Sequence, residues 1–192
     1  MNLSLARSVG RARFRVLDFE VSGCARALRR ELRRAAAYAP REALAPLEAA
    51  YHECETALLY WTGPYVLAQD GFAPWNIRNL GSQLFVYDWA HARAEASPLD
   101  DVLRYLTTQR ALSSRPLSAR ELRGAMRRAH EFALEAYPDW RWPRSVVGAL
   151  TLVYLLGSLL RHCAANRRMD DDDPLTATYR KLIATRPAWM PT

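Results

Sequence analysis

The sequence predicts an α+β fold that is mostly helical and contains a small β-hairpin. Helical periodicity covers most of the chain, strand-like runs are short, and turn-forming residues cluster between positions 70 and 82. A chain of 192 residues is also long enough to bury a substantial core within one domain or lobe.

The N-terminal part predicts a strand followed by a basic helix. Residues 14–21 (FRVLDFEV) alternate loosely and are rich in β-branched and aromatic side chains, which is typical of a short strand. Residues 24–37 have helical spacing, with Leu28 and Leu32 on one side. The opposite side carries Arg26, Arg29, Arg30, Arg33 and Arg34. Because no aromatic side chains are interleaved, this face is interpreted as solvated, and nucleic acid is not an expected partner.

The middle of the chain predicts a helix and then a hairpin. The helix is expected over residues 41–60, with Pro46 near its start. Two short apolar runs, residues 65–68 and 84–87, predict strands. Turn-forming residues at 79–82 fit a hairpin connection before the second strand.

The rest of the chain predicts helices. One of them opens with Asp100 and Asp101, whose charges suit the positive end of a helix dipole. Another opens with S-A-R-E, in which Ser118 and Glu121 predict a capping box. The helices are expected over residues 98–112, 118–137, 144–165 and 174–185.

An uncharged stretch invites a membrane interpretation. Residues 145–160 lie between Arg144 and Arg161 without a charged side chain. A membrane-spanning helix needs about 20 apolar residues, so this shorter segment is interpreted as a buried core helix. We therefore expect no membrane partner.

The composition points to anionic partners and a reducing compartment. The net charge of +7 comes from arginine, because Lys181 is the sole lysine. This balance favours anionic partners, although a GC-rich genome would produce the same arginine excess. Cys24, Cys54 and Cys163 lie far apart without metal-ligand spacing, so we expect reduced thiols and a cytoplasmic location.

The most informative segments lie near the centre of the chain. Residues 69–77 read QDGFAPWNI, residues 84–89 read LFVYDW, and residues 98–103 read PLDDVL. These pieces resemble the aminoglycoside phosphotransferase and choline kinase family, relatives of the protein kinases. That family carries HGDFAPWN in its catalytic loop, then D-W-E on the next strand and P-x-x-D-L at a helix start. The resemblance covers residues 42–192 and implies a kinase-like C-terminal lobe, whose hairpin carries a degenerate catalytic loop.

The resemblance also implies a metal site and its supports. Asn76 and Asp88 match the family positions that hold Mg²⁺, an ion that prefers hard oxygen ligands on rigid backbone. Mg²⁺ and ATP are therefore the implied cofactors. Trp75 and Trp89 are expected to pack the loop against the helices, and Asp101 is expected to cap its helix and brace the loop.

The family's catalytic base is displaced in this sequence. Gly71 stands five residues before Asn76, where the family has the aspartate that accepts the proton of the substrate hydroxyl. Asp70 is adjacent, but neighbouring residues of an extended loop point to opposite sides. A catalytic role for Asp70 therefore requires Gly71 to twist the backbone. The glutamate of D-W-E is also replaced, by Ala90.

The nucleotide-binding half of the family's enzymes has no counterpart in the sequence. No two glycines lie within three residues of each other, so no glycine-rich loop is present, and Lys181 is near the C-terminus. Residues 1–41 are expected to contain only the strand and the basic helix, at most a remnant of a hinge.

Three functions follow. The leading hypothesis is a degenerate phosphotransferase lobe that is inactive alone and binds a small polar ligand, Mg²⁺ or a protein partner. The first alternative is an active ATP-dependent small-molecule phosphotransferase that a separate N-lobe completes, with Asp70 as the base. The second alternative is a truncated gene fragment that acts only as an interaction module.

Overall fold

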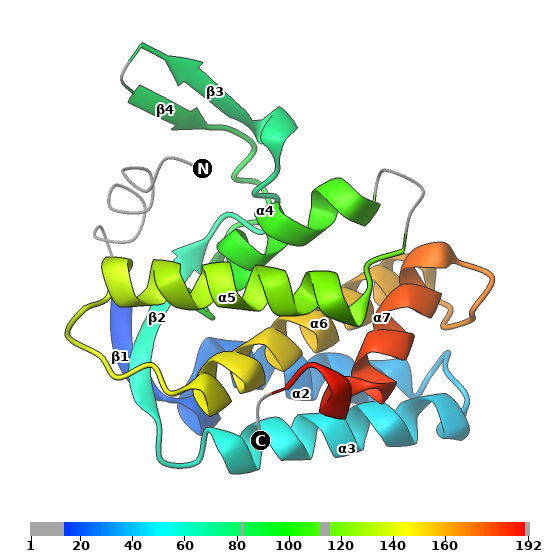
Figure 1. Cartoon of the computed structure of the whole chain (residues 1–192). Coiled ribbons are helices and arrows are strands. Elements are labelled where there is room, and N and C mark those ends of the chain that lie inside the picture. The colour runs from blue at the N-terminus through cyan, green and yellow to red at the C-terminus, as the bar shows by residue number, and fades with distance from the viewer. Residues whose placement is uncertain (1–13, 82, 112–115, 191–192) are drawn as a thin grey trace.

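The structure is a computed structural model that describes residues 14–81, 83–111 and 116–190. Within these residues the fold is α+β and mostly helical, as predicted (Figure 1). Helices surround a long central helix, and two small antiparallel sheets complete the structure. The loop at residues 69–76 leads from the first sheet to the second.

The central helix is α6 (Arg144–Asn166), and its residues from Val146 to Leu160 are all buried. It is the one helix of the described residues that is long and apolar enough to cross a membrane. However, 89% of its most apolar window is buried inside the fold, which confirms the interpretation as a core helix. The helices that pack against it are α2 (Gly23–Ala35), α3 (Arg41–Ala57), α4 (Asp100–Ala111), α5 (Ala119–Ala136) and α7 (Pro174–Ala184).

One sheet joins the N-terminal strand to the middle of the chain. β1 (Phe14–Asp18) pairs along its whole length with β2 (Thr62–Ala68), and β5 (Arg93–Ala96) pairs with the other edge of β2. In addition, Leu28 and Leu32 of α2 are buried in the same apolar core as α6. The described part of residues 1–41 therefore shares its core with residues 42–190.

β5 was not predicted, because its sequence R-A-E-A favours a helix. Its strand geometry is supported by ionic contacts of Glu95 rather than by β-propensity. Glu95 pairs with Arg15 and with Arg26, and it accepts the Gly23 backbone N–H at 2.9 Å. These partners lie far away in the sequence, so local patterning does not reveal them.

The second sheet is the predicted hairpin of β3 (Ile77–Leu80) and β4 (Gln83–Val86), which projects from the helices (Figure 1). Trp75 and Trp89, which are expected to pack the loop against the helices, are 49% and 41% exposed, so about half of the surface of each is open to solvent. Trp89 Nε1 donates to the carbonyl of Val86 at 2.8 Å.

The start of α5 agrees with its predicted capping box. The Glu121 N–H donates to Ser118 Oγ at 3.2 Å, and the Ser118 N–H donates to Glu121 Oε2 at 3.0 Å. Leu117 and Leu122 on either side are buried, as a hydrophobic staple requires.

Candidate functional site

The loop that follows β2 is held by the first turn of α4. The Asp101 carboxylate accepts the backbone N–H of Gln69 at 2.8 Å and that of Asp70 at 3.2 Å. Burial raises the pKa of Asp101 to about 6, although the two backbone N–H groups oppose this shift. These contacts agree with the bracing role expected of Asp101.

Gln69 connects this loop to the end of β4. Its buried amide Nε2 donates to the carbonyls of Tyr87 and Asp88, both at 2.7 Å. Its Oε1 accepts the Gly71 N–H at 3.0 Å. One side chain therefore sets the positions of the loop and of the backbone at Asp88.

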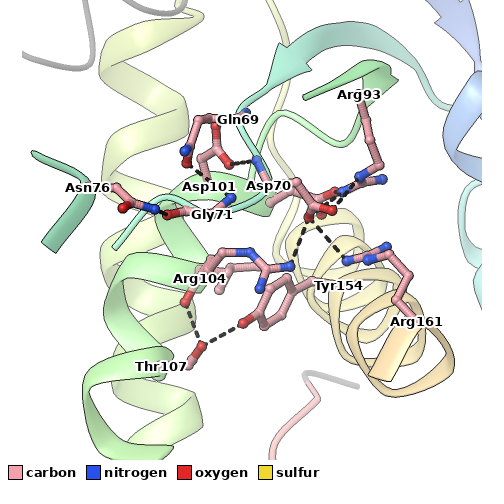
Figure 2. Close-up of polar contacts among 12 residues, drawn as sticks. Gln69, Asp70, Gly71, Asn76, Arg93, Asp101, Arg104, Thr107, Tyr154 and Arg161 are labelled. Atoms are coloured by element: carbon pink, nitrogen blue, oxygen red, sulfur yellow. Dashed lines mark hydrogen bonds and ion pairs between the residues drawn. The ribbon is translucent and has the colours of Figure 1, made fainter. Parts of the chain in front are cut away.

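Asp70 points into the body of the protein, away from Asn76 (Figure 2). Its carboxylate forms ion pairs with Arg93 at 3.1 Å, Arg104 at 2.8 Å and Arg161 at 3.4 Å. The Asp70 side chain is only 9% exposed. Burial opposes its charge, but the three guanidinium groups outweigh burial and hold the pKa of Asp70 below its ordinary value.

A second carboxylate extends this ion cluster. Arg93 Nη2 donates to Asp100 Oδ2 at 2.7 Å, so Arg93 bridges the two aspartates. The Arg104 guanidinium also lies over the ring of Tyr154, 5.9 Å from its centroid. Burial and the nearby Arg93 lower the pKa of Arg161. The cluster therefore holds three guanidinium groups against two carboxylates.

These contacts argue against Asp70 as a catalytic base, which corrects the sequence-based assignment. A base must reach the proton that it abstracts, whereas both Asp70 carboxylate oxygens are occupied by guanidinium groups. Gly71 does not turn this side chain outward. Asp70 itself adopts a left-handed φ of 61°, and its carboxylate lies on the inner side of the loop.

Position 71, in contrast, faces Asn76. A Cβ atom added to Gly71 would lie 3.3 Å from Asn76 Nδ2 and 3.3 Å from Gln69 Nε2, so it would enter the space between these two amides. This Nδ2 donates to the Gly71 carbonyl at 2.9 Å, as Figure 2 shows. The position that the resemblance assigns to the base is therefore oriented toward Asn76 and has no side chain.

Asp88 follows Tyr87, whose backbone hydrogen bond with Asn76 joins the two strands at the base of the hairpin. The Tyr87 N–H donates to the Asn76 carbonyl at 2.9 Å, and the exposed Asp88 has a left-handed φ of 59°. Among the described residues, no group of three or more His, Cys, Asp or Glu side chains is placed to hold a metal ion. Asn76 and Asp88 offer one amide and one carboxylate. Mg²⁺ bound by so few protein ligands depends on water and substrate phosphates, so this pair does not fit a resident metal site.

Comparison of the chain with protein-family models, curated proteins and solved structures gives no match. The phosphotransferase resemblance therefore rests on the sequence motif and stays a prediction.

The three arginines around Asp70 were not predicted from the sequence. Arg93 lies in a segment with helical character, and Arg104 is an ordinary residue of α4. Arg161 carries the one detectable signal, since it follows the long uncharged stretch of α6. A charge at the edge of a buried helix needs a partner, and here that partner is Asp70.

Proposed function

We propose that this chain is a non-catalytic lobe of the phosphotransferase type, which acts by binding rather than by phosphoryl transfer. The observation that carries the proposal is the opposite orientation of positions 70 and 71. The carboxylate of Asp70 is directed into a cluster of arginines, and Gly71, which faces Asn76, has no carboxylate. The three free cysteines are buried, and we place the protein in the cytoplasm.

The missing carboxylate removes a specific step. Phosphoryl transfer depends on positioning of the acceptor hydroxyl and on neutralisation of the phosphate charge. Without a carboxylate at position 71, a hydroxyl beside Asn76 lacks the side chain that accepts its proton in the family. Asp70 cannot substitute, because turning it outward would leave three arginines without their shared partner.

The surface around the hairpin supports a binding role. Its exposed aromatic side chains, each between 41% and 49% accessible, are Trp75, Phe85, Tyr87 and Trp89. Aromatic side chains grouped on a surface are typical of interaction sites. The Asp88 carboxylate adds a polar contact at the base of the same hairpin. We therefore assign the binding role to residues 71–89.

A phosphotransfer assay tests the loss of catalysis. The purified chain is incubated with radiolabelled ATP, Mg²⁺ and a panel of aminoglycoside, choline and sugar acceptors, and both phosphorylated acceptor and released phosphate are measured. We expect no product above the protein-free rate. ATP-dependent labelling that Asp70→Asn abolishes, while Glu20→Gln (an exposed acidic residue elsewhere) leaves it unchanged, would overturn the proposal.

The exposed aromatic hairpin also favours a second candidate, docking of a separately encoded nucleotide-binding lobe. The measurement is copurification of this chain with such a lobe, recognised by a glycine-rich loop and a strand lysine. Docking through the hairpin predicts that Trp75→Ala with Trp89→Ala abolishes the complex. The exposed Tyr60→Ala variant is the control, since this side chain is 96% accessible and lies outside the hairpin. A complex that survives the double substitution contradicts docking at this surface.

A further inference from the structure

A pocket of about 600 Å³ lies between α5, the first turn of α6 and the 3₁₀ helix η3 (Arg186–Ala188). Sites for small organic ligands typically enclose about 300–1,000 Å³. None of the residues that line this pocket belongs to the loop or the hairpin described above. The pocket is therefore a separate candidate, and its test is independent of the proposed function.

The lining of the pocket is strongly basic. Arg120, Arg123 and Arg127 follow one another at helical spacing along a face of α5, and Arg144 joins them from α6. The lining also contains His130 and one carboxylate, Glu131. The lining therefore contains four guanidinium groups and a single carboxylate.

Most of these arginines are not used by the fold. Arg123 donates to the carbonyl of Ala188 and so helps to hold η3. In the part of the chain that the structure describes, Arg120, Arg127 and Arg144 take part in none of the ion pairs. Like charges that gather without a partner repel one another, so an anion in this pocket would relieve the repulsion.

The start of α6 adds to the same field. Its N-cap, Pro143, provides no side-chain hydrogen bond, and its first turn has no acidic residue. The first N–H groups of a helix lack intrahelical partners and carry partial positive charge. Phosphate groups bind readily at such helix ends, and here Arg144 places the helix end at the pocket.

The remaining walls are apolar. Met126 and Val147 line the pocket beside Trp189 and Met190. Trp189 is only 2% exposed, and its Nε1 donates to the Leu182 carbonyl at 2.8 Å, so the indole has a fixed position. A ligand in this pocket therefore meets guanidinium groups at one part of its surface and a rigid apolar wall at another.

We propose that this pocket binds an organic phosphate. Its phosphate group would lie among Arg120, Arg127 and Arg144, and its apolar or aromatic body would pack against Met126 and Met190, behind which Trp189 is fixed. Arginine is suited to this role because its planar fork donates two parallel hydrogen bonds to phosphate oxygens. We favour a phosphate over a carboxylate because a phosphate monoester has three terminal oxygens and a carboxylate only two. The additional oxygen allows hydrogen bonds to several guanidinium groups and to the helix end at once.

Methionine methyl NMR tests the proposal, because the methionines supply both reporters and an internal control. Met126 and Met190 line the pocket, whereas Met169 is buried at another place in the fold. The chain, labelled with ¹³C at its methionine methyl groups, is titrated with 1-naphthyl phosphate, inorganic phosphate and 1-naphthol. We expect saturable shifts of Met126 and Met190 with 1-naphthyl phosphate at concentrations up to about 5 mM, and no shift of Met169.

Matched variants then assign the phosphate contact. Arg127→Gln combined with Arg144→Gln should weaken 1-naphthyl phosphate at least about tenfold, because charge-assisted hydrogen bonds are lost. Arg128→Gln removes an exposed charge from the same helix outside the lining and should leave the affinity unchanged. These arginines are exposed, so the substitutions preserve the core.

Four results would overturn the proposal. The first is that the Met126 and Met190 signals do not move with 1-naphthyl phosphate. The second is that 1-naphthol binds as tightly as its phosphate. The third is that inorganic phosphate binds as tightly as 1-naphthyl phosphate, which would reduce the pocket to an anion site without an apolar subsite. The fourth is that Arg128→Gln weakens binding as much as the double substitution, which would indicate attraction by net charge alone.

Discussion

The two sides of the loop at residues 69–76 differ in how their polar groups are satisfied. On the inner side, the Asp70 carboxylate has three guanidinium partners, and Gln69 uses both ends of its amide. On the outer side, Gly71 has no side chain, Asp88 is exposed, and the hairpin displays accessible aromatic rings. The inner side is built for stability, and the outer side is open to ligands or partners.

The comparison shows how the order of two neighbouring residues decides the role of a carboxylate. Relative to H-G-D, the sequence Q-D-G moves the acidic side chain by one position. Asp70 has a left-handed φ of 61°, and its carboxylate joins the core contacts instead of the space beside Asn76. A group that would serve chemistry on the outer side stabilises the fold on the inner side.

The largest expected effect is the loss of Asp70. Asp70→Ala should lower the free energy of unfolding by about 3–5 kcal/mol, because three partly buried arginines lose their shared counter-ion. Urea denaturation of the variant and the parent measures this difference. Asp88→Ala on the exposed side should change the free energy by no more than about 0.5 kcal/mol. Equal effects of the two substitutions would contradict the division between the sides.

The next effect concerns the connection through Gln69. Gln69→Ala should cost about 2–3 kcal/mol, since it leaves the carbonyls of Tyr87 and Asp88 and the N–H of Gly71 without their partner. Hydrogen exchange at the Gly71 amide should accelerate more than the global loss of stability explains. Unchanged exchange at Gly71 would indicate that Gln69 does not hold the loop.

A smaller effect concerns the pH dependence of the free energy of unfolding. As the pH falls, titration of Asp101 should raise this free energy, whereas titration of Asp70 should lower it. The pKa of Asp101 is raised from 3.8 to about 6 in the folded protein, so the folded state binds the additional proton. Its unfavourable contribution should therefore diminish between pH 7 and pH 4, whereas the stabilisation by Asp70 is lost as the pH falls through 3.8 and below.

The measurement is the free energy of unfolding as a function of pH for the parent and for Asp101→Asn. From pH 7.5 to pH 5, the parent should gain about 1–2 kcal/mol relative to the variant. The Asn side chain cannot titrate, and the backbone N–H acceptor that it loses contributes equally at every pH, so the pH-dependent part of the difference reports the titration of Asp101. A difference that is constant with pH would show that Asp101 does not titrate in this range.

The sequence predicted those parts of the fold that depend on local chemistry. The capping box at Ser118, the buried helix α6 and the hairpin all follow from neighbouring residues, and the structure contains them. Strand β5 could not be predicted, because the contacts of Glu95 with Arg15 and Arg26 span many residues.

The candidate site shows the same limit. The family resemblance indicated Gly71 as the position without its carboxylate, and alternation along the loop indicated that Asp70 points elsewhere. The contacts of the Asp70 side chain could not be predicted, because its partners come from β5, α4 and α6. The exposure of Trp75 was also missed, since a hairpin predicted from pattern alone has no direction relative to the helices.

Calorimetric titration of Gly71→Asp with Mg²⁺ tests the central claim most directly, because a side chain at this position enters the space beside Asn76. The added carboxylate should bind Mg²⁺ at least about tenfold more tightly than the parent, and Asn76→Ala in the same chain should abolish the gain. Gly124→Asp is the matched control, since it adds the same charge on α5 where a Cβ meets no atom within 4 Å. If Gly71→Asp binds Mg²⁺ no more tightly than Gly124→Asp, position 71 does not face the site that Asn76 and Asp88 would form, and the account is contradicted.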